Sequence, residues 1–147
     1  MNIHQLFNGG NMVYTHKIQY YETDKMGVTH HSNYFRFMEE ARIDFLNGIG
    51  FPYDKVEENG IISPVIGIEC EYKNTSTYPD ILNIETSVIE YNSFKIRLKY
   101  VMTNQDGKLI AVGTSKHCFL SKEGRILSLK KAMPELDLKF NEICIKN

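Results

Sequence analysis

The sequence has little surplus charge of either sign and no long apolar run. Lys and Arg number 17 against 18 Asp and Glu, giving a formal net charge of −1 at pH 7. This balance argues against bulk attraction to nucleic acid or to an anionic membrane, although a local basic patch is compatible with it. No segment approaches the ~18 consecutive apolar residues of a membrane-spanning helix. We therefore expect no nucleic-acid partner and no membrane span.

Cysteines are few and do not form a recognisable pattern. Cys70, Cys118 and Cys144 are widely separated and odd in number, so they suggest neither a disulfide framework nor a CxxC metal site. The N-terminus also lacks a basic stretch followed by an apolar run, which a secretion signal would need. These features predict a cytoplasmic protein with reduced thiols.

Length and composition are those of one globular domain. The chain has 147 residues, of which 42% are hydrophobic and 24% charged. That length can bury one sizeable core. The "NGG" at 8–10 predicts a flexible leader over residues 1–12, followed by a single domain over 13–147.

Hydrophobic periodicity predicts one strand, one long helix and four further strands. Alternation begins at Tyr14, and a stripe at spacings of three and four follows from Tyr34 to Ile49. Ser32 or Asn33 is predicted to cap this helix, and Gly48 to end it in a left-handed conformation. The stripe consists of Tyr34, Phe37, Met38, Ala41, Phe45, Leu46 and Ile49.

After the helix the period becomes two. The strands centre on 66–72, 84–88, 94–102 and 108–120, with a hairpin turn at 104–107. A run of antiparallel strands with one segregated helix indicates an α+β fold. One sheet and one helix would leave apolar edges uncovered, so we also expect a homo-oligomer.

The turn at residues 22–31 contains more polar chemistry than a turn requires. Asp24 and Gly27 are ordinary turn residues, since Gly accepts a positive φ or lets a substrate approach the backbone. Adjacent His30 and His31 would suit a metal, but no HExxH-like spacing accompanies them. We expect no metal and no other cofactor.

The turn and the helix together resemble the hotdog-fold acyl-CoA thioesterases of the 4-hydroxybenzoyl-CoA thioesterase type. The resemblance extends from about Tyr14 to Leu129 and includes "SPVIGIECEYKNTSTYPDIL" and "AVGTSKHCFLSKEGR". Its main motif is Y-x-x-T-D-x-x-G-V-x-H-H-x-x-Y-x-x-x-x-E-x-A-R, formed by Tyr20, Thr23, Asp24, Gly27, Val28, His30, His31, Tyr34, Glu39, Ala41 and Arg42.

This resemblance implies a five-stranded antiparallel sheet wrapped around the long helix, in a dimer or a dimer of dimers. The active sites would lie at the subunit interface and take an acyl-CoA substrate. Asp24 would be the nucleophile or the general base, and the backbone amide of His31 would hydrogen-bond the thioester carbonyl. A carboxylate beside a helix N-terminus supplies both the attacking group and a donor for the developing negative charge.

Further residues are predicted to contact the substrate. Ser63, Pro64 and Val65 would approach the partner's active site, as the resemblance implies, whereas Lys122 and Arg125 would bind the phosphates of CoA. Within the motif, the predicted substrate-binding residues are Gly27, Val28 and Tyr34. Glu39 and Arg42 are three apart on the helix and are expected to pair. The stripe formed by Lys95, Arg97 and Lys99 is expected to be a solvated face.

Two other functions compete with acyl-CoA hydrolysis. The chain could hydrolyse an acyl group carried on an acyl-carrier protein, using the same Asp24. It could also be a non-catalytic acyl-CoA-binding hotdog module, which would not need that carboxylate. The presence of Asp24 together with the residues of the helix start favours an enzyme.

Overall fold

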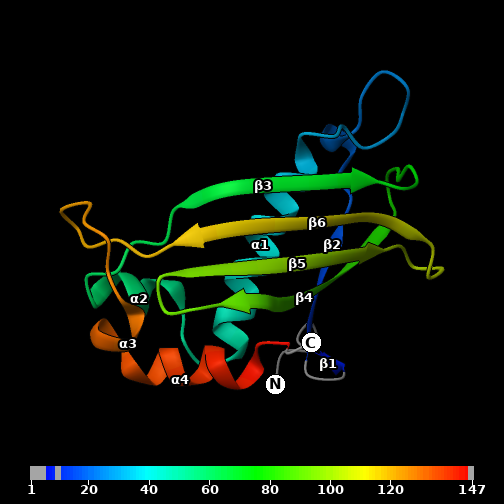
Figure 1. Cartoon of the computed structure of the whole chain (residues 1–147). Coiled ribbons are helices and arrows are strands. Elements are labelled where there is room, and N and C mark those ends of the chain that lie inside the picture. Colours follow the sequence, from blue (N-terminus) through cyan, green and yellow to red (C-terminus); the bar gives the residue numbers. More distant parts are fainter. Residues whose placement is uncertain (1–5, 9–10, 146–147) are drawn as a thin grey trace.

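The computed structural model describes residues 6–8 and 11–145, and these form one antiparallel sheet with a long helix across one face (Figure 1). The strand order in the sheet is β1-β2-β4-β5-β6-β3. The strands are β1 (Leu6–Asn8), β2 (Asn11–Lys17), β3 (Val65–Tyr72), β4 (Ile81–Tyr91), β5 (Lys95–Thr103) and β6 (Leu109–Cys118). The helices are the 3₁₀ turn η1 (Tyr20–Glu22), α1 (Asn33–Gly48), α2 (Tyr53–Glu58), α3 (Leu129–Ala132) and α4 (Pro134–Ile143).

The expected α+β hotdog arrangement is confirmed, with one short strand added. β2 to β6 are the five predicted strands, in the predicted order around α1. β1 pairs with β2 and becomes the sixth strand, at the sheet edge. The segment predicted as a leader therefore contributes Leu6–Asn8 and the first two residues of β2 to the sheet. Residues 1–5 and 9–10 of that segment lie outside the described residues.

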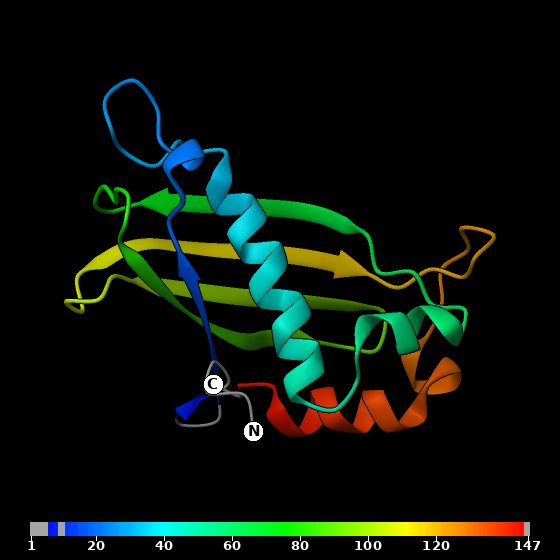
Figure 2. The ribbon, with the colours of Figure 1, turned by 180° about the vertical axis from the view of Figure 1, so that it is seen from behind.

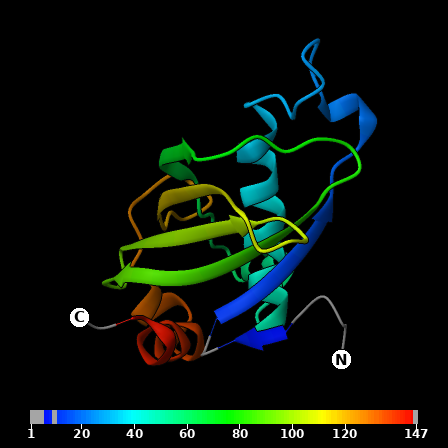
Figure 3. The same ribbon diagram turned by 90° about the vertical axis from the view of Figure 1, so that its right-hand side faces the viewer.

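α1 lies diagonally across the concave face of the sheet, which curves around it (Figures 2 and 3). β5 shows why one face suits the helix: Leu98 and Tyr100 are buried while Lys95 and Lys99 are exposed. This alternation confirms that the basic stripe of β5 lies on the outer face of the sheet.

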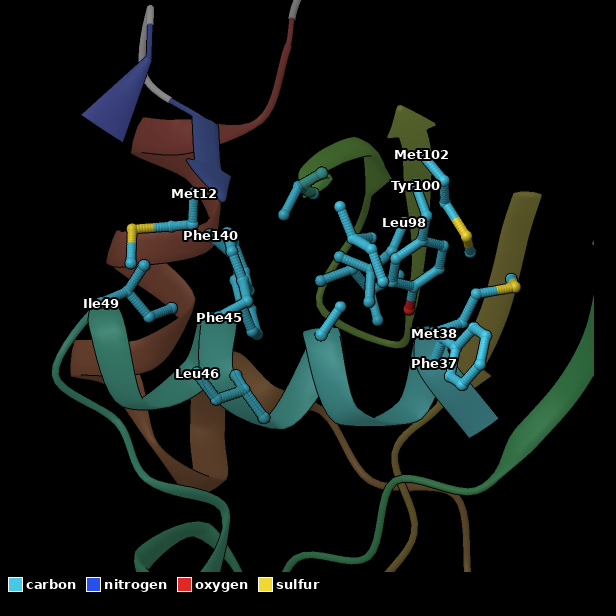
Figure 4. Close-up of a cluster of buried hydrophobic side chains, with 14 of the residues drawn as sticks. Met12, Phe37, Met38, Phe45, Leu46, Ile49, Leu98, Tyr100, Met102 and Phe140 are labelled. Carbon is cyan, nitrogen blue, oxygen red and sulfur yellow. The ribbon is translucent and has the colours of Figure 1, made fainter. Parts of the chain in front are cut away.

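The core forms between α1 and the inner face of the sheet (Figure 4). All seven residues of the predicted helix stripe are buried. At Gly113 on β6, an added Cβ would lie 2.7 Å from Met38 Cε and 3.1 Å from the Glu69 carbonyl oxygen. Glycine at this position therefore lets α1 approach the sheet closely. α4 closes the core beside the C-terminal end of α1, where Phe140 is buried (Figures 2 and 4).

The two ends of α1 differ from the prediction. Ser32 precedes the helix, but its hydroxyl lies 2.8 Å from His30 Nδ1 and makes no side-chain cap. Gly48 is the last helical residue, and the left-handed conformation occurs two residues later, at Gly50 with φ 90°. The chain therefore leaves the helix later than the glycine pattern suggested. None of the helices in the described ranges has the length and apolarity needed to cross a membrane.

Candidate active site

Asp24 lies in a tight loop that joins η1 to α1. The loop is closed by a bridge between Thr23 and Thr29, and the Asp24 N–H donates to the Val28 carbonyl at 2.8 Å. Gly27 has φ 78°, which confirms the predicted positive φ. A residue with a Cβ would strain this turn, so the glycine has a backbone role at this point.

The Asp24 carboxylate divides its two oxygens between different tasks. Oδ1 accepts the Met26 N–H at 2.8 Å and the Val28 N–H at 3.4 Å, which is a local turn interaction. Oδ2 accepts no hydrogen bond from any described residue, and the side chain is only half-buried. One oxygen therefore stabilises the turn while the other stays accessible for chemistry.

An open hollow of about 320 Å³ lies beside this carboxylate. Four of the predicted site residues line it, and Tyr72 and Lys73 from the end of β3 complete its wall. The four are Asp24, Val28, His31 and Tyr34. Gly27 supports the hollow without lining it, because its carbonyl accepts the Thr77 hydroxyl at 2.6 Å. We refer to this space as the Asp24 hollow.

The start of α1 offers a hydrogen-bond donor to the same hollow. Within the described ranges, no acceptor receives a hydrogen bond from the His31 backbone N–H. The first turn of α1 contains no acidic residue that would neutralise the positive end of the helix dipole. The His31 ring is exposed and stacks on His30 at a centroid distance of 4.3 Å. The backbone of His31 is therefore better placed than its ring to receive negative charge.

Glu22 anchors both ends of the Asp24 loop. Its side chain, in a residue that is 6% exposed, accepts the Gln19 N–H at 2.7 Å and lies 2.9 Å from His16 Nε2. Its backbone carbonyl accepts the His30 N–H at 2.8 Å and the Asn33 amide at 2.9 Å. The sequence prediction missed this role, because alternation and spacing do not reveal which backbone groups a buried carboxylate organises.

The chain between β3 and β4 forms a second support. Ser76 is buried, and its hydroxyl lies 2.7 Å from the Thr29 hydroxyl and 2.8 Å from the Tyr34 phenol. The Tyr72 phenol donates to the His31 carbonyl at 3.1 Å. Burial raises the pKa of both phenols, so both stay protonated and uncharged at neutral pH. Only the strand alternation that places Tyr72 on the helix side could have indicated this contact.

The remaining predicted substrate-binding residues lie at the opposite end of the protomer. Ser63, Pro64 and Val65 lead into the start of β3, whereas Lys122 and Arg125 are exposed in the turn after β6. A bridge between Ile62 and Leu120 holds these two segments side by side. In Figure 1 the Asp24 loop extends beyond one end of β3 and the turn after β6 lies toward the other.

In the part of the chain that the structure describes, no three His, Cys, Asp or Glu side chains are grouped to hold a metal ion. His30 bonds to Ser32 through Nδ1, and the rings of His30 and His31 stack on each other.

Comparison with protein families gives a match over most of the chain. The model of the thioesterase-like superfamily matches residues 18–140. A relative from Aquifex aeolicus, provisionally named an esterase, is 37% identical over 124 residues, covering 84% of this chain and 95% of that protein. A Bacillus subtilis relative provisionally named an acyl-CoA thioesterase is 34% identical over 120 residues, covering 81% of this chain and 87% of its own.

Solved structures share the fold. The crystal structure of a DHNA-CoA thioesterase from Staphylococcus aureus superimposes with a TM-score of 0.87 at 30% sequence identity. The match covers 90% of this chain and 90% of that one. The family match over residues 18–140 includes the loop that carries Asp24, α1 and strands β3 to β6.

Proposed function

The chain belongs to the thioesterase-like superfamily, and from this premise we propose that it hydrolyses acyl-CoA to a free carboxylic acid and CoA. The names of the Bacillus subtilis and Staphylococcus aureus proteins support CoA thioesters as the substrate class. The observation that carries the proposal is that one hollow is lined by both Asp24, whose Oδ2 accepts no hydrogen bond from the described residues, and His31, whose N–H donates to none of them. No metal or other cofactor takes part in the reaction as proposed.

Asp24 supplies the carboxylate for the reaction by one of two routes. As a nucleophile, Oδ2 adds to the thioester carbon, the C–S bond breaks, and water then hydrolyses the resulting anhydride. As a general base, the carboxylate takes a proton from water while the water oxygen adds to the same carbon. Both routes release the CoA thiol and the acid, and both use the accessible oxygen.

The His31 amide stabilises the negative charge that develops on the carbonyl oxygen. A backbone N–H at a helix start is fixed before the substrate arrives, so it needs no reorganisation during the reaction. Loss of one such donor typically costs roughly 3 kcal/mol of transition-state stabilisation. Val28 and Tyr34 line the walls of the same hollow and contact the substrate there.

The complete site forms between two subunits that pair through β3. β3 is an edge strand whose Val65, Ile66 and Tyr72 are exposed, and such an edge favours pairing with another strand. We propose that the two β3 strands pair antiparallel over their full length about a two-fold axis, a register that puts Val65 opposite the partner's Tyr72. Ser63, Pro64 and Val65 then face the partner's Asp24 hollow, and Lys122 and Arg125 lie close enough to bind CoA phosphates.

The catalytic assignment is tested with Asp24→Asn, assayed by CoA-thiol release from a panel of acyl-CoAs. Asn retains an oxygen that can accept the Met26 N–H, so the loop should keep its shape while the nucleophile or base is lost. We expect turnover to fall by roughly 10²–10⁴-fold. Asp106→Asn, in the exposed turn after β5, is the matched control. Wild-type turnover in folded Asp24→Asn would reject the assignment.

The subunit arrangement is tested with Ile66→Asp, which adds a charge to the exposed edge of β3. We expect a lower mass in analytical ultracentrifugation and a parallel loss of activity, because each site would lack its partner's residues. Ile126→Asp changes an equally apolar but more exposed residue outside β3 and should keep the wild-type mass. An active monomer would contradict an interfacial site.

The carrier of the acyl group is decided by comparing substrates. Turnover of acyl-CoA supports the proposal. Turnover of acyl-carrier-protein substrates alone would make the protein an acyl-carrier-protein thioesterase instead. If the folded wild-type protein hydrolyses neither but binds acyl-CoA, it is a binding module.

A further inference from the structure

A second hollow, of about 210 Å³, lies between α1 and the inner face of β3. Phe35 and Met38 from α1 form one apolar wall, and Val65 and Ile68 from β3 form the other. Arg42, Tyr100, Ser115 and His117 also line it, and we refer to this space as the Arg42 hollow. Apolar walls with a few charged groups are typical of a pocket that selects a ligand by its polar end.

Arg42 begins a buried chain of polar groups under this hollow. Its Nη1 lies 2.8 Å from His117 Nδ1, and His117 Nε2 lies 2.8 Å from the Ser115 hydroxyl. The Tyr100 phenol follows, 2.7 Å from the same hydroxyl. Because a guanidinium only donates, His117 Nδ1 must accept, and the ring keeps its single proton on Nε2. The geometry therefore describes a neutral imidazole.

The electrostatic surroundings of His117 agree with this geometry. Burial and the neighbouring Arg42 lower the pKa of His117 to about 4, and hydrogen bonding to the Ser63 and Pro64 backbone opposes the shift without outweighing it. At neutral pH the ring thus orients Arg42 without adding charge. It provides no negative charge to balance the guanidinium.

The charge of Arg42 is incompletely balanced within the protomer. The Glu39 carboxylate also lines the hollow, but its Oε1 is 3.9 Å from Nη2 and its side chain is 69% exposed, against 11% for Arg42. Nη2 makes no hydrogen bond to any of the described residues. Arg36 adds a second positive charge to the lining, which leaves the hollow with a net positive charge. A largely buried cation of this kind favours an anionic ligand, and a guanidinium binds carboxylates through two parallel N–H groups.

The location of the hollow connects it to the proposed reaction. Val65 lines the Arg42 hollow and, in the proposed β3 pairing, lies opposite the partner's Tyr72, which lines the partner's Asp24 hollow. An acyl group held at the partner's Asp24 would therefore extend toward Arg42.

We propose that the Arg42 hollow binds a carboxylate at the far end of the acyl group, so that the preferred substrates are CoA thioesters of dicarboxylic acids. This inference rests on the proposed function and on β3 pairing. Phe35, Met38, Val65 and Ile68 pack against the methylene groups, while Arg42 pairs with the terminal carboxylate.

The test compares two acyl-CoAs of equal chain length that differ only in the terminal group, adipoyl-CoA and hexanoyl-CoA. We expect wild-type kcat/KM to be at least about tenfold higher for adipoyl-CoA, and Arg42→Gln to lower this ratio by roughly 10- to 100-fold, mainly through KM. Since both substrates are measured on one sample, the ratio does not depend on the fraction of folded enzyme. Arg42→Lys, which keeps the charge but not the planar fork, should lower the ratio less.

Arg97→Gln is the matched control, because it removes an Arg–Glu pair on the outer face of the sheet, outside both hollows. It should keep the wild-type ratio. A wild-type enzyme that does not prefer adipoyl-CoA, or an unchanged ratio in Arg42→Gln, overturns the inference while leaving thioester hydrolysis in place. If Arg42→Gln kept the wild-type ratio but no longer formed a dimer, Arg42 would instead pair with a carboxylate of a second copy of this chain. Absence of hydrolysis with every acyl-CoA overturns the proposed function as well.

Discussion

The Asp24 hollow and the Arg42 hollow are built in different ways, although both lie along α1 and β3. The first is formed largely by loops, which backbone groups of Glu22, Thr29 and Ser76 tie together. The second is formed by side chains that project from a helix and from strands. The polar residues of the Arg42 hollow, Tyr100, Ser115 and His117, are buried, whereas Asp24 remains half-buried.

This difference separates chemistry from recognition. A loop can aim a carboxylate and a backbone N–H at one point, but it holds them only as firmly as its few anchors allow. Side chains on regular elements are positioned by packing, and a buried polar chain needs every member to be satisfied. We therefore expect changes at the Asp24 hollow to alter mainly catalysis. Changes at the buried polar groups beneath the Arg42 hollow, such as His117, should also alter folding stability.

The largest expected effect on folding stability concerns His117 and appears as a dependence on pH. The ordinary pKa near 6.5 applies to the unfolded chain, whereas the folded value is about 4, so only the unfolded chain binds the proton between these values. The stability due to neutral His117 is thus complete above pH 6.5 and is lost as pH falls toward 4, by roughly 3 kcal/mol. Urea unfolding measured at several pH values checks this.

His117→Gln isolates that contribution. Gln can accept from Arg42 and donate to Ser115, but it does not titrate. The difference in unfolding free energy between the wild type and this variant should shrink between pH 6.5 and pH 4, since carboxylates elsewhere contribute equally to both. A difference that does not change with pH would contradict a buried neutral His117.

The next effect concerns the anchor of the Asp24 loop. Glu22→Gln replaces the carboxylate that accepts the Gln19 N–H and contacts His16, so it loosens η1, which leads into the Asp24 loop, while the Glu22 carbonyl keeps its bonds to His30 and Asn33. A displacement of about 1 Å can cost roughly 10²-fold in rate, so we expect kcat to fall by up to that factor with a smaller change in KM.

A double variant distinguishes positioning from general destabilisation. If Glu22 acts through Asp24, then Glu22→Gln should lower the residual activity of Asp24→Asn far less than it lowers that of the wild type. Glu40→Gln is the matched control, because Glu40 also contacts His16 but, among the described residues, accepts no backbone N–H such as the one that Glu22 accepts from Gln19. Equal losses in both backgrounds would show that Glu22 does not act on the catalytic carboxylate.

The smallest effect is expected from Tyr72→Phe. This change removes one hydrogen bond to the His31 carbonyl and keeps the ring in place. A hydrogen bond of this type contributes about 1 kcal/mol, so kcat/KM should fall only a few-fold. A loss as large as that of Asp24→Asn would mean that the phenol itself contacts the reacting atoms.

Much of the fold could be predicted because local periodicity reflects burial. The stripe from Tyr34 to Ile49 and the alternation in β5 both face the core, as their spacing indicated. The helix ends were less predictable: Ser32 bonds to His30, and Gly50 rather than Gly48 takes the positive φ, because caps depend on a few competing local bonds. The cytoplasmic location remains a prediction.

For the site, the sequence by itself determined that a carboxylate, a glycine turn and a helix start follow one another closely, since their spacing is a property of the chain. Only the tertiary structure decided what surrounds them. Tyr72 and Ser76 support the Asp24 hollow through contacts with residues 41 and 42 positions away in sequence, whereas Glu22 supports it from 11 positions away. Arg42 looked like a surface residue paired with Glu39, and it proved to be largely buried over a neutral His117. Burial and the charge balance that follows from it depend on which elements pack together, and that information is not contained in residue spacing.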